Sequence, residues 1–444
     1  MVKEELVGQI ELSSEQFARW QKTLSNVSQF SKNLNDNLAD IEQVTATLQM
    51  MLAGAVILNG SDIHFEPGEQ KIKLRIRLDG VLHDAAFIEP PLYNKILSRV
   101  KLLSGLKLNI TNRSQDGRFT LQIADSGDKT TEIEVRVSVL PSEYGEAVVM
   151  RVLNPQSLLS IEELGIREDL REAFEKEINR PNGMLIVTGP TGSGKTTTLY
   201  AVLKKIRNPE IKIITLEDPI EYHLEGISQS QVNPESGYTF ASGLQAIVRQ
   251  DPDAILVGEI RDLETAQMAI QAALTGHLVL TTLHTNDAAG TVARLQALGE
   301  KPSEIASALN AVVAQRLVRK VCPVCAEMKK PNEKELKEIE EEIMSLPPEV
   351  KKALKTDALM KGLKIAQAKG CDQCNSTGYK SRIGIYEMFI VDEELENFIT
   401  KMPSIVDLNK KAREKGMTTI KQDGIIKVLQ GATTLDEVNK MVGE

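Results

Sequence analysis

The sequence is poor in cysteine, in aromatic residues and in long apolar runs, and it has no excess of positive charge. Only 4 of its 444 residues are cysteine, which excludes a small secreted protein held together by disulfide bonds. Aromatic residues make up 4%, so aliphatic side chains must fill most of the core. The longest apolar run, from Met50 to Leu58, is well short of the ~20 residues that a membrane-spanning helix needs.

The charge balance excludes other classes of protein. Acidic residues outnumber basic residues by 62 to 53, which gives a net charge of −9. Because non-specific nucleic-acid binding rests on accumulated positive charge, we expect no nucleic-acid partner. The N-terminal residues carry acids where a signal peptide would have a basic and then an apolar stretch. We therefore expect a cytoplasmic protein, and at this length about three domains.

Composition and periodicity change several times along the chain. Residues 1–48 are polar with apolar residues at loose helical spacing, which predicts either helices packed on the body or a partner-binding helix. Residues 49–155 alternate apolar and polar residues and predict a small α+β domain, followed by a linker over 156–170. Over residues 171–444, strand and helix patterns alternate, which predicts an α/β domain with a parallel sheet. This domain has a charged insert within 320–384 and a helical end over 388–444.

One glycine-rich segment has the pattern of a phosphate-binding loop. Residues 189–196 read Gly-Pro-Thr-Gly-Ser-Gly-Lys-Thr and lie between an expected strand and an expected helix. Such glycines let backbone N–H groups turn around phosphate oxygens, while the lysine reaches the β- and γ-phosphates and the threonine binds Mg²⁺. We therefore predict an ATP site with Mg²⁺; a ligand-free turn is the alternative. The candidate nucleotide-binding residues are Gly189, Pro190, Thr191, Gly192, Ser193, Gly194, Lys195, Thr196 and Thr197.

Acidic residues follow two of the expected strands. Glu217 and Glu221 belong to a cluster at the end of one apolar strand, and Glu259 follows another. Because the carboxyl ends of parallel strands meet at one edge, both groups should face the glycine-rich loop. We expect Glu259 to hold Mg²⁺ through water, and Glu221 or Glu217 to orient the attacking water. The alternative is that all three are solvated strand ends.

Two histidines, His277 and His284, bracket one apolar strand. A single histidine is more often structural than catalytic. Two histidines around a strand of this core predict hydrogen bonds to the γ-phosphate, which would sense its presence.

All four cysteines occur in two C-x-x-C pairs, Cys322 with Cys325 and Cys371 with Cys374. Four thiolates suit tetrahedral Zn²⁺, and a closed site of four cysteines is structural because no position remains for water. A redox pair and unligated thiols are the alternatives.

Together these motifs resemble the hexameric secretion ATPases, which comprise type II secretion ATPases, type IV pilus assembly and retraction ATPases, and more distant type IV secretion ATPases. The resemblance adds the segment Arg249-Gln-Asp-Pro-Asp-Ala-Ile-Leu-Val-Gly-Glu-Ile-Arg-Asp262. Upstream, Ser61-Asp-Ile-His-Phe-Glu-Pro67 and Gln115-Asp-Gly-Arg118 are similar to the N-terminal domain of this family. The match covers roughly residues 50–444.

The resemblance implies roles for individual residues. It implies that Glu259 is the Walker B acid, that Glu221 is the general base and that Lys195 binds phosphate. Arg118 and Arg136 look like the arginine fingers of the family, although both would also suit solvated strand positions. The family further implies a ring of six protomers at the inner face of the cytoplasmic membrane, acting on a polytopic platform protein.

The four cysteines select a branch of the family, because retraction ATPases lack the tetracysteine insert. The resemblance therefore implies a motor for pilus or pseudopilus extension. A retraction motor, a nucleotide-gated scaffold without appreciable hydrolysis and a zinc-dependent nucleic-acid binder are the alternatives. Assembly ATPases usually have a further N-terminal domain that docks on a membrane partner or binds a cyclic dinucleotide, and we expect none here.

Overall fold

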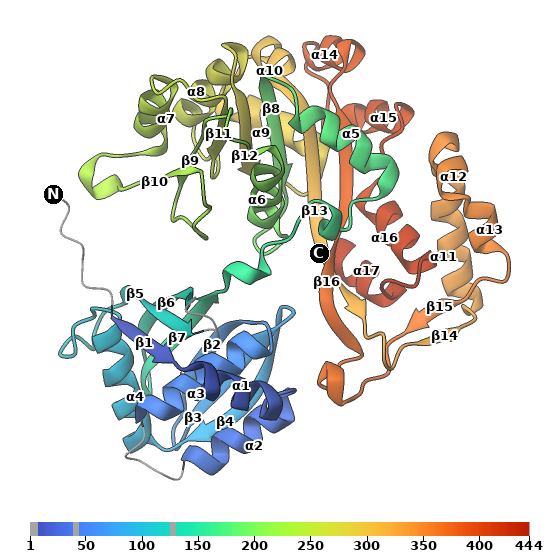
Figure 1. Ribbon diagram of the computed structural model, residues 1–444. Coiled ribbons are helices and arrows are strands. Elements are labelled where there is room, and N and C mark those ends of the chain that lie inside the picture. Colours follow the sequence, from blue (N-terminus) through green and yellow to red (C-terminus); the bar gives the residue numbers. More distant parts are fainter. Residues whose placement is uncertain (1–7, 39–43, 125–129, 444) are drawn as a thin grey trace. The chain divides into compact units, whose positions relative to one another are not determined.

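The computed structural model describes residues 8–38, 44–124 and 130–443, and it divides into two compact units. The first unit comprises residues 1–157 with 369–380, and the second comprises residues 158–368 with 381–444. Each unit contains a seven-stranded sheet of its own (Figure 1). Across the described ranges, we find no helix that combines the length and the apolar character needed to cross a membrane.

The sheet of the first unit has the strand order β1-β5-β6-β7-β2-β3-β4. Its strands pair antiparallel, except that β1 runs parallel to β5. The strands are β1 (Gln9–Leu12), β2 (Gly60–Pro67), β3 (Ile72–Leu78), β4 (Val81–Ile88), β5 (Gln115–Ala124), β6 (Thr130–Ser142) and β7 (Gly145–Leu153). The helices are α1 (Ser14–Thr23), α2 (Val27–Leu38), α3 (Val44–Ile57) and α4 (Pro90–Leu103), and a short 3-10 helix spans Pro155–Ser157.

Strict alternation gives this first sheet two different faces. In β3 the apolar residues Ile72, Leu74 and Ile76 are buried and pack in one core with residues of α3 and α4, whereas the basic residues between them are half-buried. Asp79 and Gly80 both have positive φ and form the two-residue turn of the hairpin that joins β3 to β4, a turn for which Asp-Gly is a favoured dipeptide. One face of the sheet is therefore apolar and the other is charged.

The amino-terminal segment differs from its expected helical character at one place. Gln9–Leu12 forms β1, and its Ile10 and Leu12 side chains are buried in the core of the first unit. A strand of four residues shows only two apolar positions, which is too short a pattern to distinguish from a loose helical spacing.

The sheet of the second unit has the strand order β10-β9-β11-β12-β8-β13-β16, and the pairs from β10 through β13 are parallel. Its strands are β8 (Gly183–Thr188), β9 (Ile213–Glu217), β10 (Ser228–Gln231), β11 (Ala254–Val257), β12 (Leu278–Leu283), β13 (Leu309–Val321) and β16 (Tyr379–Ile390). The helices that alternate with them are α5 (Glu168–Ile178), α6 (Lys195–Ile206), α7 (Phe240–Val248), α8 (Leu263–Leu274), α9 (Ala288–Leu298) and α10 (Pro302–Ala308).

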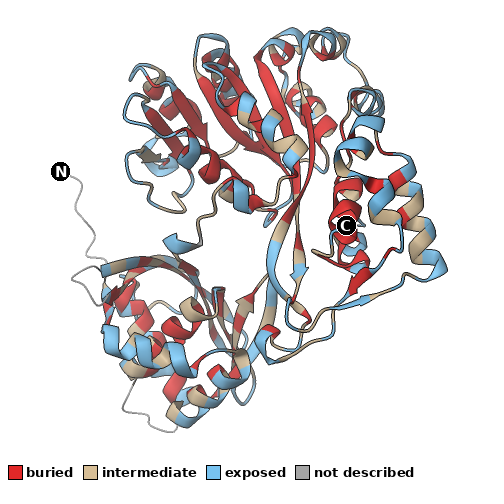
Figure 2. Cartoon of the chain, turned by 45° about the vertical axis from the view of Figure 1, so that its right-hand side comes forward, coloured by how far each residue is buried: buried red, intermediate tan, exposed pale blue. Residues whose placement is uncertain are grey.

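Helices cover both faces of this second sheet. Residues of α5 and α6 pack in one core on one face, and residues of α7, α8, α9 and α10 pack in another core on the other face. All residues of β8, β11 and β12 are consequently buried, and these strands are coloured as buried in Figure 2. Since both faces are closed, the strand ends are the part of this sheet that is left for polar chemistry.

Smaller elements complete the chain after β13. They are β14 (Glu327–Lys329), α11 (Glu333–Met344), α12 (Pro348–Leu354), α13 (Thr356–Met360), β15 (Ile365–Gln367), α14 (Glu393–Ile399), α15 (Ile405–Glu414), α16 (Ile420–Leu429) and α17 (Leu435–Val442). Further 3-10 helices lie at Glu162–Leu164, Pro234–Ser236 and Asp372–Cys374. The charged insert is helical, and α11 ends before the Pro347-Pro348 pair, because proline cannot continue a helix interior.

Candidate functional site

The glycine-rich loop connects the carboxyl end of β8 to the amino end of α6, and β13 packs closely against it. Gly189 has φ +150° and Gly194 has φ +89°. A Cβ atom at Gly189 would lie 2.5 Å from the carbonyl oxygen of Gln315, and one at Gly194 would lie 2.8 Å from the Gln315 side-chain amide. Both positions therefore require glycine, because of their backbone conformation and because of the close approach of β13.

Gln315 is a buried residue of β13 that the sequence reasoning missed. Its Oε1 atom accepts a hydrogen bond of 2.7 Å from the hydroxyl of Thr198, which lies in α6. The amide thus connects the strand below the loop to the helix that follows the loop. A glutamine within the apolar run of β13 was the only signal in the sequence.

Lys195 places its ammonium group at the loop itself. Nζ donates to the carbonyl oxygens of Gly189 at 2.8 Å and Pro190 at 3.1 Å. Burial lowers the pKa of Lys195, the Glu259 carboxylate opposes this effect, and Arg316 adds to it. The side chain is buried yet hydrogen-bonded, so its charge is held where the loop would receive a phosphate.

The rest of the loop fits a phosphate-binding cradle. The hydroxyl of Ser193 is buried, and among the described residues it has no hydrogen-bond partner. Thr196 is exposed in the first turn of α6, where its hydroxyl is accessible to a metal ion, and Thr197 is half-buried. Pro190, Thr191 and Gly192 form the exposed rim of the loop. An unsatisfied hydroxyl, a held ammonium and a helix amino terminus together suit a triphosphate with Mg²⁺.

Glu259 lies two residues beyond β11 and contacts the residue that follows β12. One oxygen of its carboxylate pairs with Arg261, and the other lies 3.6 Å from Nε2 of His284. The side chain of Glu259 is only 16% exposed. Burial and the Lys195 charge lower the pKa of His284, while Glu259 opposes them. The lowered pKa favours the neutral imidazole, in which one ring nitrogen donates a hydrogen bond and the other accepts one.

The two histidines lie at opposite ends of β12. In the parallel pairing with β8, Leu283 is opposite Thr188, which precedes the loop, whereas Leu278 is opposite Gly183. His284 therefore lies at the loop end, and His277 lies at the other end, with its Nδ1 3.0 Å from the carbonyl oxygen of Ala272. Residues that bracket a strand lie at opposite edges of the sheet, so of the two only His284 lies at the loop end in this chain, and the expected contact of both histidines with a γ-phosphate stays a prediction.

A chain of hydroxyl groups connects the glycine-rich loop to the segment after His284. The Thr188 Oγ1 atom lies 2.7 Å from Oγ1 of Thr285 and accepts from the Thr285 backbone N–H at 2.9 Å. Thr285 in turn lies 3.1 Å from Thr291 of α9. These contacts join β8, β12 and α9 directly behind the loop, and the sequence reasoning found none of them.

Glu217 is the last residue of β9 and is an internal hydrogen-bond acceptor. It is 3% exposed, and its carboxylate accepts from Thr215 at 2.5 Å and from Gln229 at 3.3 Å, as well as from the hydroxyl of Tyr200 in α6. Burial and the Glu217 charge raise the pKa of Tyr200. These contacts give Glu217 a structural role between α6, β9 and β10, and a role toward nucleotide stays a prediction.

Glu221 lies in the segment between β9 and β10 and is half-buried. Its backbone N–H donates to the hydroxyl of Tyr200 at 3.3 Å, so the same tyrosine positions both acids of the cluster. Its expected action as a general base stays a prediction.

Arg118 and Arg136 belong to the first unit and lie opposite one another on β5 and β6. Both contact Glu134: Nη1 of Arg118 lies 3.5 Å and Nε of Arg136 lies 2.9 Å from its carboxylate oxygens. Because they are opposite one another in an antiparallel pair, their side chains lie on the same face of the first sheet. Their expected action as arginine fingers stays a prediction.

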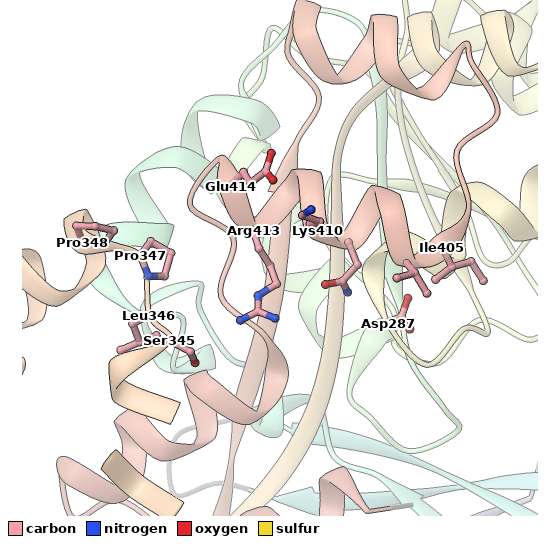
Figure 3. Close-up of a pocket in the computed structure, with 11 residues that line it drawn as sticks. Asp287, Ser345, Leu346, Pro347, Pro348, Ile405, Lys410, Arg413 and Glu414 are labelled. Carbon is pink, nitrogen blue, oxygen red and sulfur yellow. The ribbon is translucent and has the colours of Figure 1, made fainter. Parts of the chain in front are cut away.

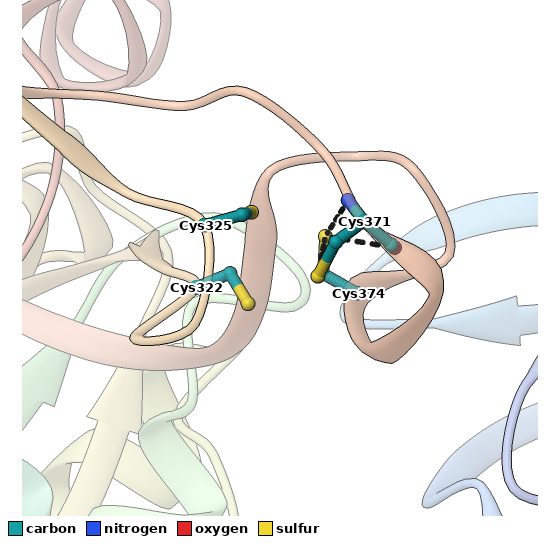
Figure 4. A group of neighbouring side chains, drawn as sticks. All are labelled: Cys322, Cys325, Cys371 and Cys374. Atoms are coloured by element: carbon teal, nitrogen blue, oxygen red, sulfur yellow. Dashed lines mark hydrogen bonds between the residues drawn. The ribbon is translucent and has the colours of Figure 1, made fainter.

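The four cysteines form one cluster, in which all Sγ atoms lie within 4.8 Å of one another (Figure 4). Sγ of Cys371 and Sγ of Cys374 are 3.8 Å apart, and the thiol of Cys374 also accepts from the N–H of Gly378 at 3.2 Å. A tetrahedral ion with Zn–S distances of about 2.3 Å would separate its sulfur ligands by about 3.8 Å. The residues present therefore fit a structural Zn²⁺ ion.

The family described as "Type II/IV secretion system protein" matches residues 37–440. Among individual proteins, the chain is 42% identical over 414 residues to type II secretion system protein E of Dickeya dadantii, covering 92% of this chain and 78% of that protein. It is 41% identical over 392 residues to the type IV pilus assembly ATPase PilB of Thermus thermophilus, covering 88% of this chain. The matched region spans only 42% of that Thermus protein.

Solved structures are similar in fold. The chain matches a crystal structure of the pilus retraction motor PilT with bound ADP at a TM-score of 0.58 and 25% identity, covering 88% of this chain and 96% of that one. It matches the Legionella pneumophila ATPase DotB at a TM-score of 0.63 and 20% identity, covering 89% of this chain and 95% of that one.

Proposed function

This chain belongs to the type II/IV secretion system protein family, and from that premise we propose that it is a hexameric, Mg²⁺-dependent motor ATPase for extension of a type IV pilus or a type II secretion pseudopilus. The observation that carries the proposal is the convergence of Lys195, Glu259 and His284 at one edge of the second sheet. ATP hydrolysis needs a phosphate-binding ammonium, an acid for the metal and a closed scaffold that holds both.

Several residues divide the work of hydrolysis in this proposal. Lys195 and the loop N–H groups bind the phosphates, and Thr196 and Glu259 would hold Mg²⁺. When bound, the ion neutralises charge on the β- and γ-phosphate oxygens. Glu221 accepts the proton of the attacking water. Arg118 and Arg136 stabilise the charge that spreads over the transferring phosphoryl group, for which a guanidinium fork is suited.

Two observations support extension of the fibre rather than its retraction. Matched proteins named for type II secretion or pilus assembly are 41–42% identical to this chain. The cysteine cluster supports the same branch, since the resemblance to secretion ATPases places such an insert in assembly and secretion members. The proposed partners are five further copies of this chain and a polytopic platform protein at the inner face of the membrane.

The proposal is tested first with purified protein and then in cells. Phosphate release from ATP should require Mg²⁺ and should stop when the ion is chelated. Failure of the wild-type chain to release phosphate under any nucleotide and metal condition would leave the nucleotide-gated scaffold and the zinc-dependent nucleic-acid binder as the alternatives.

A deletion strain separates extension from retraction. Loss of surface fibres or of secretion supports the proposed extension motor. Excess fibres that do not retract would instead support a retraction motor, the alternative that the match to PilT favours.

A further inference from the structure

A cavity of about 640 Å³ lies on the second unit, away from the glycine-rich loop, between the turn that joins α11 to α12 and the exposed side of α15 (Figure 3). Ser345 and Pro347 line one wall, Ile405 and Arg413 line the other, and Asp287 lies at one end. Its volume is in the range of binding sites that enclose a ligand group or a partner side chain.

The two cations of this cavity are unpaired, whereas its two acids are engaged. Among the residues that the structure describes, the side chains of Lys410 and Arg413 contact no acid and no hydrogen-bond acceptor. Glu414 lies 3.8 Å from Lys411, and Asp287 caps α9 through a 2.7 Å bond from the N–H of Gly290. Both acids keep their negative charge, so the positive charge available to a partner is confined to Lys410 and Arg413.

Lys411 of α15 and Lys415, directly after the helix, show that this difference is local. Lys411 pairs with Glu394, and Lys415 lies 2.7 Å from both Asp392 and Glu394. Lys410 and Arg413 are three residues apart and so lie on one side of α15. Asp287 and Glu414 line the same cavity, but within the described part of the chain neither acid forms an ion pair with these two cations. One side of α15 is thus neutralised within the protein, and the cavity side is not.

Apolar side chains complete the cavity. Leu346, between Ser345 and Pro347 in one wall, is 3% exposed, while Ile405 and Val406 are 44% and 76% exposed on α15. Exposed aliphatic groups beside a buried leucine favour contact with an apolar side chain of a partner.

A short stretch of chain connects the cavity lining to the residues behind the glycine-rich loop. Asp287 lines the cavity, and Thr285, two residues earlier, contacts Thr188 just before the glycine-rich loop. A partner bound here would lie against the segment that begins at His284.

We propose that this cavity binds an acidic segment of a partner protein that inserts one aliphatic or aromatic side chain between carboxylates directed at Lys410 and Arg413. A protein segment is favoured over an anionic membrane surface because a membrane offers charge without a side chain that fills a hollow of this size. The proposal concerns binding alone and is independent of ATP hydrolysis.

The test uses a panel of capped, fluorescein-labelled peptides, each with one Leu, Ile or Phe between pairs of Asp or Glu at varied spacing. Binding to the full chain is measured by fluorescence anisotropy without nucleotide. We expect some acidic peptides to bind the wild-type chain and to bind the Lys410→Glu/Arg413→Glu variant about tenfold more weakly or worse. That variant should instead bind matched peptides in which Lys replaces the acids.

Two further variants keep the test specific. Lys330→Glu/Lys334→Glu makes the same change of charge outside the cavity and should leave peptide binding unchanged. Val406→Ser removes apolar contact from an exposed position and should weaken binding without lowering the melting temperature.

Three results would overturn the proposal. In the first, no acidic peptide distinguishes the wild-type chain from the cavity variant. In the second, the outside variant loses binding equally. In the third, vesicles of phosphatidylcholine with phosphatidylglycerol bind through Lys410 and Arg413 while no peptide does, which would assign the surface to a membrane.

Discussion

The two sheets of this protein differ in what they leave open. Both faces of the second sheet are covered by helices, so its polar residues gather at one edge, around Lys195 and Glu259. One face of the first sheet carries charged residues that are paired with one another, such as Arg118 and Arg136 with Glu134. In the second sheet, which is covered on both faces, polar chemistry is confined to one edge, so the position of the site follows from the fold. The charged face of the first sheet offers many positions, so the fold alone does not indicate a site there.

The largest expected effect on ATP turnover is at the charged face of the first sheet. If Arg118 and Arg136 act as arginine fingers, the Arg118→Ala/Arg136→Ala variant should lose about 10³-fold or more of ATP turnover while it still binds ATP. Steady-state phosphate release and nucleotide titration measure the two quantities. Arg113→Ala, an exposed arginine of the same unit, serves as the control. Unchanged turnover in the double variant would make the pair a surface ion-pair cluster with no catalytic part.

The next largest effect on ATP turnover is expected at the glycine-rich loop, at one edge of the second sheet. Lys195→Ala removes the ammonium that lies at the loop carbonyls, and turnover should fall by about 10²- to 10³-fold, as for loss of one group that stabilises transition-state charge. Lys204→Ala, an exposed lysine of the same helix, should retain wild-type activity. Equal activity of both variants would remove the loop from the mechanism.

A smaller effect should follow from the support beneath the loop. Gln315→Leu leaves the buried hydroxyl of Thr198 without its acceptor, which should lower the free energy of unfolding by about 1–3 kcal/mol. Chemical denaturation measures this loss. The Gln315→Leu/Thr198→Val double variant removes both partners and should recover part of the stability. A double variant as unstable as the sum of the two single variants would show that the hydrogen bond contributes nothing.

The smallest effect on turnover is expected at the cysteine cluster. Wild-type chain should contain about one zinc per chain, and Cys374→Ser should lose it and melt at a lower temperature, because a structural zinc site contributes folding energy. Turnover at a temperature where the variant is folded should change less than about tenfold. Ser376→Ala in the same loop is the matched control. Absence of metal from wild-type protein purified without chelator would contradict the zinc assignment.

The parts of the site that the sequence predicts are contiguous in the chain. The glycine-rich loop and Glu259 follow buried strands directly, so their edge of the sheet is determined by chain direction. Contacts between distant residues were not predictable in the same way: Gln315 approaches Gly194, and Tyr200 contacts Glu217, only because the sheet brings them together. His277 shows a third case, since an apolar run shows that a strand exists but not which of its ends faces the ligand.

The fold itself was predictable to a similar extent. Strand and helix alternation over residues 171–444 predicts a parallel sheet, and the second unit contains one. The four-residue β1 was missed because its pairing with β5, far along the chain, stabilises it rather than its own pattern.

The measurement that tests the central claim most directly is phosphate release by Glu259→Gln beside nucleotide binding by the same variant. Glutamine keeps the shape of the side chain and removes the charge that lies beside Lys195 and His284. Glu235→Gln, an exposed acid after β10, controls for the loss of a charge. We expect Glu259→Gln to remain folded and to bind ATP while phosphate release falls by about 10²-fold or more. Phosphate release at the wild-type rate in this variant would contradict the assignment of the second sheet's edge as the site of ATP hydrolysis.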